Sequence, residues 1–245
     1  MDSLLKKGDY RPINKNFLLE GHEVLEEVTK VQEKWKKGDT DTFINELRDS
    51  MAGYYLGYEL VNVEKHGFDC KMNRYEDIFL EVKSASFAAS TWGATFNDTT
   101  IEKAKCFQSD KVYLCLAVWK NASNLLFLVY GQNPKIGRFL EEKVTRFLEG
   151  KGGVRSTQSI SMSQLIFDYD FDIVCVNKTK SEVKSILQLK SKAFSNVPNS
   201  RYLSLDEYAK KIVQICFFVP IFCPYAYFFV ILQAHKVFYV FSTNE

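Results

Sequence analysis

Histidine is scarce in this sequence of 245 residues, and the signature motifs of several large enzyme classes are missing. The three histidines, His22, His66 and His235, stand in unrelated contexts. There is no GxSxG segment, no P-loop and no GxGxxG segment. The sequence therefore offers little from which to build a serine or cysteine hydrolase triad, a nucleoside triphosphatase or a dinucleotide-binding enzyme.

An excess of charge of one sign is also absent. The chain has 32 lysines and arginines against 30 aspartates and glutamates, a formal net charge of +2. This excludes a histone-like polycation, but it leaves room for a nucleic-acid-binding protein whose bases gather on one face. The six cysteines form no CxxC pair and no Cys/His pattern with zinc spacing, so we expect no structural zinc. Residues 1–16 are charged and lack an apolar run, which favours a cytoplasmic location.

Charge almost disappears from the last part of the sequence. Residues 212–241 contain one charged side chain, that of Lys236. The uncharged stretch 212–233 is long enough to cross a bilayer, but Pro220 and Pro224 would break a helix twice. The sequence leaves three interpretations open: a pair of buried core strands, a membrane segment, or an end outside the native reading frame.

Apolar periodicity and turn residues predict alternating helices and strands before this tail. Helices are expected over residues 17–37, 40–57, 98–108, 134–148 and 205–211. Strands are expected over residues 58–65, 68–72, 78–83, 111–119, 125–130 and 171–176, and a long loop over residues 84–97. This order predicts an α/β fold in which helices flank a mixed central β-sheet of about five strands. We expect one domain over residues 1–211 and a separate apolar tail over residues 212–245.

Two acids and a lysine stand out around the second and third predicted strands. Asp69 belongs to the second strand, and Glu81-Val82-Lys83 ends the third. Because side chains alternate along a strand, Glu81 and Lys83 share a face. If the two strands are antiparallel neighbours, Asp69 and Glu81 converge at one end of the sheet. A surface ion pair on an edge strand is the alternative interpretation, but four of the six residues in the third strand are large and apolar.

Two such carboxylates repel one another unless a cation lies between them. Mg²⁺ suits this position, because it takes oxygen ligands and is commonly held by one or two carboxylates. The carbonyl of Val82 is a natural third ligand. Lys83 would orient or deprotonate a water molecule, or neutralise the charge that develops on an attacked phosphate. The residues therefore predict metal-assisted phosphodiester hydrolysis.

This pattern resembles the PD-(D/E)XK nuclease superfamily, whose members place an Asp and an acid-x-Lys motif on adjacent strands. The similarity covers residues 40–130, in the order helix, three strands, helix, strand. The segment from Glu81 to Ser86 and the helix after it look most like type II restriction endonucleases. Phe68 stands where the superfamily often has proline. The resemblance implies a restriction-endonuclease-like fold, bound Mg²⁺, and Asp69, Glu81 and Lys83 as catalytic residues.

The same resemblance implies further site residues from the flanking helices. Many members add an acid from the helix before the first strand, for which Glu46 is the first choice, followed by Asp49 and Glu59. Some members place a Gln or Lys on the helix after the catalytic strand. Three residues there are suitable, and the sequence does not choose among them: Lys103, Lys105 and Gln108.

Contacts with DNA are expected from two polar segments and a recognition region over residues 131–204. Ser84, Ser86 and Asn97 follow the catalytic motif and carry groups suited to phosphates and base edges. Arg155 and Gln158 are of the types that read guanine and adenine in the major groove. Ordinary polar surface loops are the alternative interpretation of both segments.

The function expected from these residues is Mg²⁺-dependent cleavage of double-stranded DNA at a short specific site. Because one such domain has one active site, double-strand cleavage favours a homodimer. The alternatives are a non-catalytic DNA-binding or membrane-anchored interaction protein with a nuclease-like fold, or a repair-type nuclease of the same superfamily. The tail keeps a membrane partner open as well.

Overall fold

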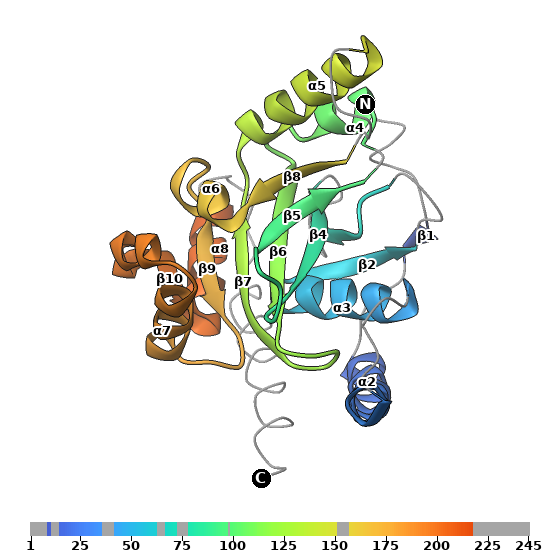
Figure 1. Cartoon of the computed structure of the whole chain (residues 1–245), viewed down its shortest axis with the longest axis vertical. Helices are drawn as coiled ribbons and strands as arrows, with labels where there is room; N and C mark the ends of the chain where they lie inside the picture. The colour runs from blue at the N-terminus through green and yellow to red at the C-terminus, as the bar shows by residue number, and fades with distance from the viewer. Residues whose placement is uncertain are drawn as a thin grey trace.

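The computed structural model describes residues 9–10, 15–35, 42–62, 67–72, 78–97, 99–150 and 157–217 (Figure 1). Its centre is an eight-stranded mixed sheet in the order β1-β2-β3-β4-β6-β7-β9-β10. The strands are β1 (Asp9–Tyr10), β2 (Tyr58–Asn62), β3 (Cys70–Met72), β4 (Phe79–Ser86), β6 (Val112–Trp119), β7 (Leu125–Gly131), β9 (Asp172–Cys175) and β10 (Tyr202–Ser204). β4 runs parallel to β6, and β10 runs parallel to β9, whereas the other neighbours are antiparallel.

The α/β class and the antiparallel pairing of β3 with β4 confirm the expectations from the sequence. The expected number of strands was wrong, because the sheet has eight strands rather than about five. The added edge strands β1 and β10 contain two and three residues. Such short segments carry too few residues for an alternating pattern to mark them in a sequence.

The two central strands explain why the sheet is buried on both faces. All residues from Leu114 to Trp119 in β6 and from Leu125 to Tyr130 in β7 are buried. Their side chains alternate between two apolar clusters, so that Leu116 faces one layer and Ala117 the other. A strand covered on both faces appears in the sequence as a continuous apolar run, which is the pattern that predicted these strands.

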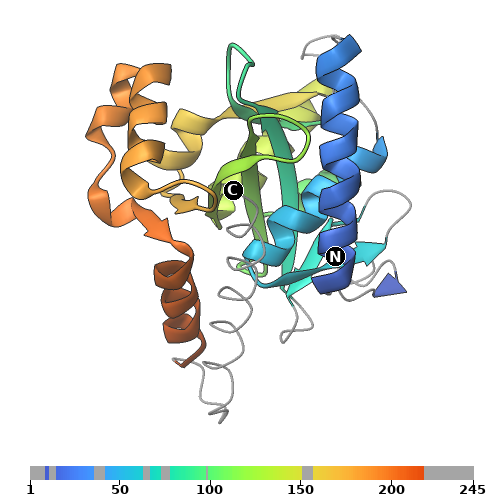
Figure 2. The same cartoon turned by 90° about the horizontal axis from the view of Figure 1, so that it is seen from below.

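Helices supply a covering layer on each face of the sheet. One cluster receives side chains from α2 (Lys15–Trp35), α3 (Thr42–Tyr55) and α8 (Leu205–Phe217). The other receives side chains from α4 (Ile101–Cys106), α5 (Pro134–Leu148), α6 (Met162–Phe167) and α7 (Lys180–Lys190). Two short 3₁₀ helices follow α7, η1 (Lys192–Asn196) and η2 (Asn199–Arg201). Figure 2 shows α2, in blue, and α7, in orange, on opposite sides of the molecule.

A separate two-stranded ribbon corrects the expected loop over residues 84–97. β4 continues to Ser86, and β5 (Gly93–Phe96) pairs antiparallel with β8 (Gln158–Ser161). In Figure 1 this β5–β8 ribbon lies in front of β4 and β6. The serines near the end of β4 interrupt the apolar pattern, but the strand stays paired with β6 along its whole length. The partner of β5 is distant in the sequence, so no local signal marks β5.

The C-terminal part contains helices that the apolar pattern did not reveal. α6 and α7 begin at capping boxes formed by Ser161 with Gln164 and by Thr179 with Glu182. α8 continues to Phe217, past the expected boundary at residue 211. Residues 218–245, which make up most of the apolar tail, lie outside the described residues. Within the described part of the chain, none of the helices has both the length and the hydropathy needed to cross a bilayer.

Candidate functional site

The site begins where β3 and β4 separate. The register between these strands runs through Lys71 opposite Phe79 and Cys70 opposite Leu80, and stops there. At the next residue, the side chain of Asp69 takes the place of the backbone pairing. Its Oδ2 accepts a hydrogen bond of 2.7 Å from the backbone amide of Val82. The divergence of the two strands therefore places a carboxylate against the backbone of the Glu81-Val82-Lys83 motif.

Glu81 and Lys83 project together from the face of β4 that also carries Phe79. Glu81 is 2% exposed, and its Oε1 lies 2.6 Å from Nζ of Lys83. The ammonium group of Lys83 also lies 5.6 Å from the centre of the Phe96 ring on the β5–β8 ribbon. The pair is thus enclosed between the sheet and the ribbon, and a solvated surface pair does not describe it.

A second lysine completes the surroundings of Glu81. Lys103, on α4, places its Nζ 2.9 Å from Oε1 and 2.8 Å from Oε2 of Glu81. The same ammonium donates a hydrogen bond of 3.0 Å to the carbonyl of Gly67. α4 is held in position at its start by the Thr100 hydroxyl, which accepts from the Lys103 amide. Of the three residues that the sequence left open, Lys103 is the one that contacts Glu81.

An additional acid approaches from α3. A Cβ on Gly53 would lie 2.5 Å from Sγ of Cys70, so the glycine allows α3 to pack closely on β3. One turn earlier on α3, the carbonyl of Asp49 accepts from the Cys70 thiol at 3.8 Å. Burial, followed by the nearby charge of Asp69, raises the pKa of Asp49 well above its usual range, and Lys83 opposes this rise. Asp49 therefore belongs to the electrostatic environment of the site.

The carboxylates differ in their protonation because their neighbours differ. Burial and the charge of Glu81 raise the pKa of Asp69 to about 6, although Lys83 and Lys103 act in the opposite direction. Burial alone would raise the pKa of Glu81, but the two lysines hold it below its ordinary value. Burial alone would lower the pKa of Lys83, but Glu81 and Asp69 raise it. Glu81 and Lys83 are therefore charged at neutral pH.

The donors at this site fit Mg²⁺ in their chemistry. They are carboxylate oxygens from Asp69 and Glu81 beside the carbonyl of Val82, which are hard ligands of the kind that Mg²⁺ takes. Oε2 of Glu81 is buried and lacks a hydrogen bond of good geometry, although Lys103 lies close to it. In the described ranges, no three His, Cys, Asp or Glu side chains are grouped so that they could hold a metal ion. The two carboxylates of Asp69 and Glu81 match the one or two that commonly hold Mg²⁺.

The other expected site residues are spread over several elements. Ser84 and Ser86 are exposed on β4, but alternation places them on the opposite face from Lys83. Asn97 is exposed directly after β5, and Gln158 is half-buried opposite Phe96 in β8. Arg155 lies outside the described residues.

The alternatives on the helices and on β2 have different surroundings. Glu46 lies in α3, but its side chain is outside the described part. Glu59 is buried in β2, opposite Lys71. Lys105 and Gln108 contact Glu141 on α5 instead of the acidic site.

Sequence reasoning ranked Asp49 behind Glu46, and it left Lys103 as one of three choices. Glu46 and Asp49 are three residues apart on one helix, so periodicity assigns both to neighbouring positions on one side. The close packing at Gly53, which is visible only in three dimensions, places Asp49 near β3, whereas the side chain of Glu46 lies outside the described part.

Comparison with known proteins identifies no family for this chain. No protein-family model matches the chain, and a search of curated proteins finds no significant match.

Proposed function

We propose that this chain is a Mg²⁺-dependent DNA endonuclease of the PD-(D/E)XK type, most similar to type II restriction enzymes. The observation that carries the proposal is the meeting of Asp69, Glu81 and Lys83 where β3 and β4 separate. Asp69 bonds to the backbone of the motif, and Glu81 pairs with Lys83 at 2.6 Å. Two carboxylates and a lysine enclosed in this way are the groups needed for hydrolysis of a phosphodiester.

Each residue has a distinct role in the proposed reaction. Asp69, Glu81 and the Val82 carbonyl would hold Mg²⁺, which when bound supplies positive charge that polarises the phosphate and lowers the pKa of water. Lys83 is protonated at neutral pH, because its neighbours raise its pKa. It therefore acts as a cation that stabilises charge developing on the phosphate, and does not act as the base. Lys103 positions the Glu81 carboxylate through its contacts with both oxygens.

The proposed substrate is double-stranded DNA, and the proposed active form is a homodimer. The described part of one chain carries one such site, so two copies related by a twofold axis would cut the two strands. The restriction-endonuclease-like fold is part of this proposal. It is supported by the sheet in which β4 is antiparallel to β3 and parallel to β6, with α4 between β4 and β6.

Cleavage of supercoiled plasmid DNA tests the proposal directly. We expect the wild-type chain to nick or linearise varied plasmids in Mg²⁺ and to be inactive in EDTA. Lys83→Ala should reduce the rate about 100-fold or more. Lys192→Ala, at an exposed lysine on η1, is the matched control and should leave the rate unchanged. Absence of cleavage by the wild type, or equal cleavage by wild type and Lys83→Ala, would exclude this function.

A second function is favoured by the charge balance around Glu81. Two ammonium groups already neutralise this buried carboxylate. A DNA-binding protein that keeps the nuclease-like fold without catalysis would retain such a network as a structural element. It predicts a complex with DNA that is insensitive to EDTA and leaves the DNA intact, so the same plasmid experiment, read for binding as well as cleavage, separates the two functions.

A further inference from the structure

The β5–β8 ribbon brings together two polar segments that are far apart in the sequence. Its register pairs Thr95 with Ser159 and Phe96 with Gln158. The side chains alternate between the protein and the solvent: Ala94, Phe96 and Ile160 are buried, whereas Thr95 and Ser159 are exposed. Asn97 and Thr157, which flank the paired residues, are also exposed. One face of the ribbon therefore carries short neutral side chains able to donate and accept hydrogen bonds.

The hydroxyl and amide groups of these outward side chains have no hydrogen bonds inside the described part of the protein. Among the described residues, none hydrogen-bonds to the side chains of Thr95, Asn97, Thr157 or Ser159. Ser161 differs, because its hydroxyl is used in the capping box of α6. The outer face thus offers two pairs of hydrogen-bonding groups from two adjacent strands.

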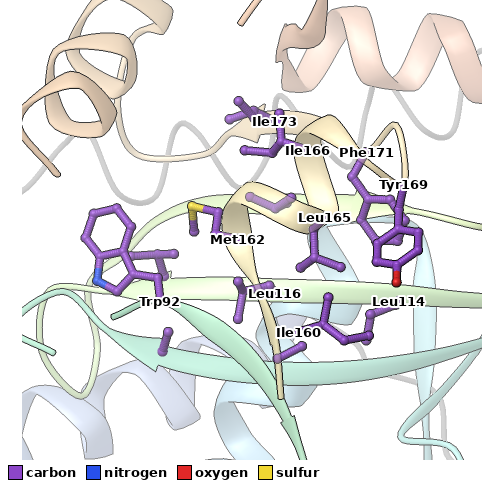
Figure 3. Close-up of a cluster of buried hydrophobic side chains, with 14 of the residues drawn as sticks. Trp92, Leu114, Leu116, Ile160, Met162, Leu165, Ile166, Tyr169, Phe171 and Ile173 are labelled. Atoms are coloured by element: carbon purple, nitrogen blue, oxygen red, sulfur yellow. The ribbon is translucent and has the colours of Figure 1, made fainter. Parts of the chain in front are cut away.

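The inner face of the ribbon is fixed against the core. Figure 3 shows Ile160 and Met162 lying against Leu114 and Leu116 of β6, with Trp92 beside them. The indole of Trp92 donates hydrogen bonds of 3.1 Å and 3.3 Å to the carbonyls of Ser86 and Phe87, respectively.

The two strands of the ribbon also lie unusually close at one end. A Cβ on Gly93 would lie 2.8 Å from the carbonyl oxygen of Ile160 and 3.2 Å from Oγ of Ser159. Together with the packing of the inner face, this close approach makes the ribbon a rigid platform. A rigid platform loses little entropy when it binds.

We propose that the outer face of the β5–β8 ribbon enters the major groove of duplex DNA and reads base edges, with Thr95 and Ser159 as its central contacts. The inference rests on the function proposed above and deepens it by assigning the source of sequence specificity. The major groove is wide enough to admit a two-stranded β-ribbon, and Ser and Thr hydrogen-bond to base edges there. Short side chains allow the ribbon to approach the bases closely.

The position of the ribbon relative to the catalytic residues supports this assignment. The ring of Phe96, on the inner side of β5, lies 5.6 Å from Nζ of Lys83. The inner face of the ribbon therefore covers the proposed catalytic pair, and a duplex that reached this pair would pass beside the ribbon. The outer face is neutral, and neutral polar side chains suit hydrogen bonds to base edges. Contacts to phosphates commonly come from charged side chains elsewhere on a DNA-binding protein.

Binding selection on the full chain tests the ribbon without depending on cleavage. Lys83→Ala protein is used to enrich sequences from a random duplex library, and fluorescence anisotropy then compares the enriched duplex with a scrambled one. Adding Thr95→Val and Ser159→Ala should weaken binding to the enriched duplex at least tenfold and change binding to the scrambled duplex less than twofold. The matched control adds Ser195→Ala and Ser200→Ala, at exposed serines of η1 and η2, and should change neither affinity.

A second measurement asks which groove is read. The enriched duplex is synthesised with 7-deazapurines, which remove an acceptor from the major groove alone. We expect weaker binding by the Lys83→Ala protein, and we expect this penalty to shrink in the variant that also lacks the Thr95 and Ser159 hydroxyls.

The outcomes separate this inference from the proposed function. If no duplex is enriched, if the ribbon variant keeps full discrimination, or if deazapurines have no effect, the ribbon does not read the major groove. Plasmid cleavage by the wild-type chain can succeed in all of these cases. If plasmid cleavage fails while the ribbon variant loses discrimination, the nuclease proposal is overturned, but the proposal that the ribbon reads the major groove is retained.

Discussion

The carboxylate of Asp69 is bonded to the backbone amide of Val82 at 2.7 Å, so an acid from one strand is fixed to the centre of the motif on the next. The two strands cease to pair at this point. The position of Asp69 relative to Glu81 and Lys83 is therefore set by the backbone as well as by side-chain packing. Substitutions in these three residues should change metal binding and stability in different directions.

Replacing Glu81 should destabilise the chain strongly. Glu81→Gln leaves the half-buried ammonium groups of Lys83 and Lys103 without their buried counter-charge, and the expected loss in the free energy of unfolding is about 3–5 kcal/mol. Glu142→Gln, which removes an exposed pair with Arg146, should cost about 0–1 kcal/mol. Urea denaturation at pH 7 without Mg²⁺ measures both; equal stabilities would show that the Glu81 network is not formed.

Replacing Asp69 should have the opposite effect at neutral pH. Its pKa of about 6 in the folded chain lies above the ordinary aspartate value of 3.8, so the folded state binds more protons between these values. The Asp69 contribution to stability is therefore lost as pH rises from about 4 to 7, by up to about 3 kcal/mol. Asp69→Asn should remove this loss, because Asn still accepts from the Val82 amide.

The measurement is urea denaturation at several pH values without Mg²⁺, with Asp110→Asn, at an exposed position, as the control. A variant less stable than the wild type at pH 7 would contradict the expectation for Asp69. Added Mg²⁺ should raise the melting temperature of the wild type but not that of Asp69→Asn, because ligands stabilise only the state that binds them.

Replacing Lys103 should move the pH dependence of activity. The charge of Lys103 lowers the pKa of Asp69, so Lys103→Met should raise that pKa further above 6. Protonated Asp69 binds Mg²⁺ poorly, and the acidic limb of the cleavage profile should therefore shift to higher pH. Lys103→Arg keeps the charge and should shift it less, and Lys105→Met serves as the control. Identical acidic limbs of the cleavage profile for wild type and Lys103→Met would show that Lys103 does not influence the protonation of the site.

The extra acid on α3 can be identified by comparing two residues of the same helix. Asp49 interacts electrostatically with Asp69, Glu81 and Lys83. Asp49→Asn should weaken Mg²⁺ binding about 10-fold or more, as replacements near a metal ligand commonly do. Calorimetric titration with Mg²⁺ would test this against Glu46→Gln. A larger effect at Glu46 would restore the first choice made from the sequence.

The contact between α4 and α5 should tolerate no added carbon at Gly137. A Cβ there would lie 2.6 Å from the carbonyl oxygen of Ala104 and from the amide of Gln108. Gly137→Ala should therefore lower the free energy of unfolding by about 1–3 kcal/mol and displace α4, which carries Lys103. Glu142→Ala, on the exposed side of α5, is the control. An unchanged urea midpoint for Gly137→Ala would contradict this packing.

Long apolar runs and turn residues were sufficient to predict the centre of the fold. β6 and β7 are such runs joined by a turn, and α5 starts at Pro134 after an Asn cap. The β5–β8 ribbon could not be predicted in the same way, because its pairing depends on contacts between distant segments. α6 and α7 carried a local signal in their capping boxes, but α6 has only 6 residues and the 11 residues of α7 are mostly polar.

The residues of the candidate site show the same difference between local sequence signals and contacts between distant segments. The spacing of Asp69 from Glu81-Val82-Lys83 indicated which strands would meet, because side-chain alternation and antiparallel pairing are simple rules. Asp49 and Lys103 come from helices whose positions over the sheet are set by packing at Gly53 and Gly137. No periodicity in the sequence measures such close approaches, so the sequence placed Asp49 behind Glu46 and left Lys103 as one of three choices.

The pairing of β7 on both edges has a consequence for how the chain folds while it is being synthesised. β7 pairs with β6 on one side and with β9 on the other, and β9 leaves the ribosome only after α5, β8 and α6. During synthesis, the β6–β7 hairpin therefore exists with an open apolar edge before its permanent neighbour is available. An edge of this kind is a template for association between nascent chains. Chaperone binding to the hairpin would protect the chain in that interval.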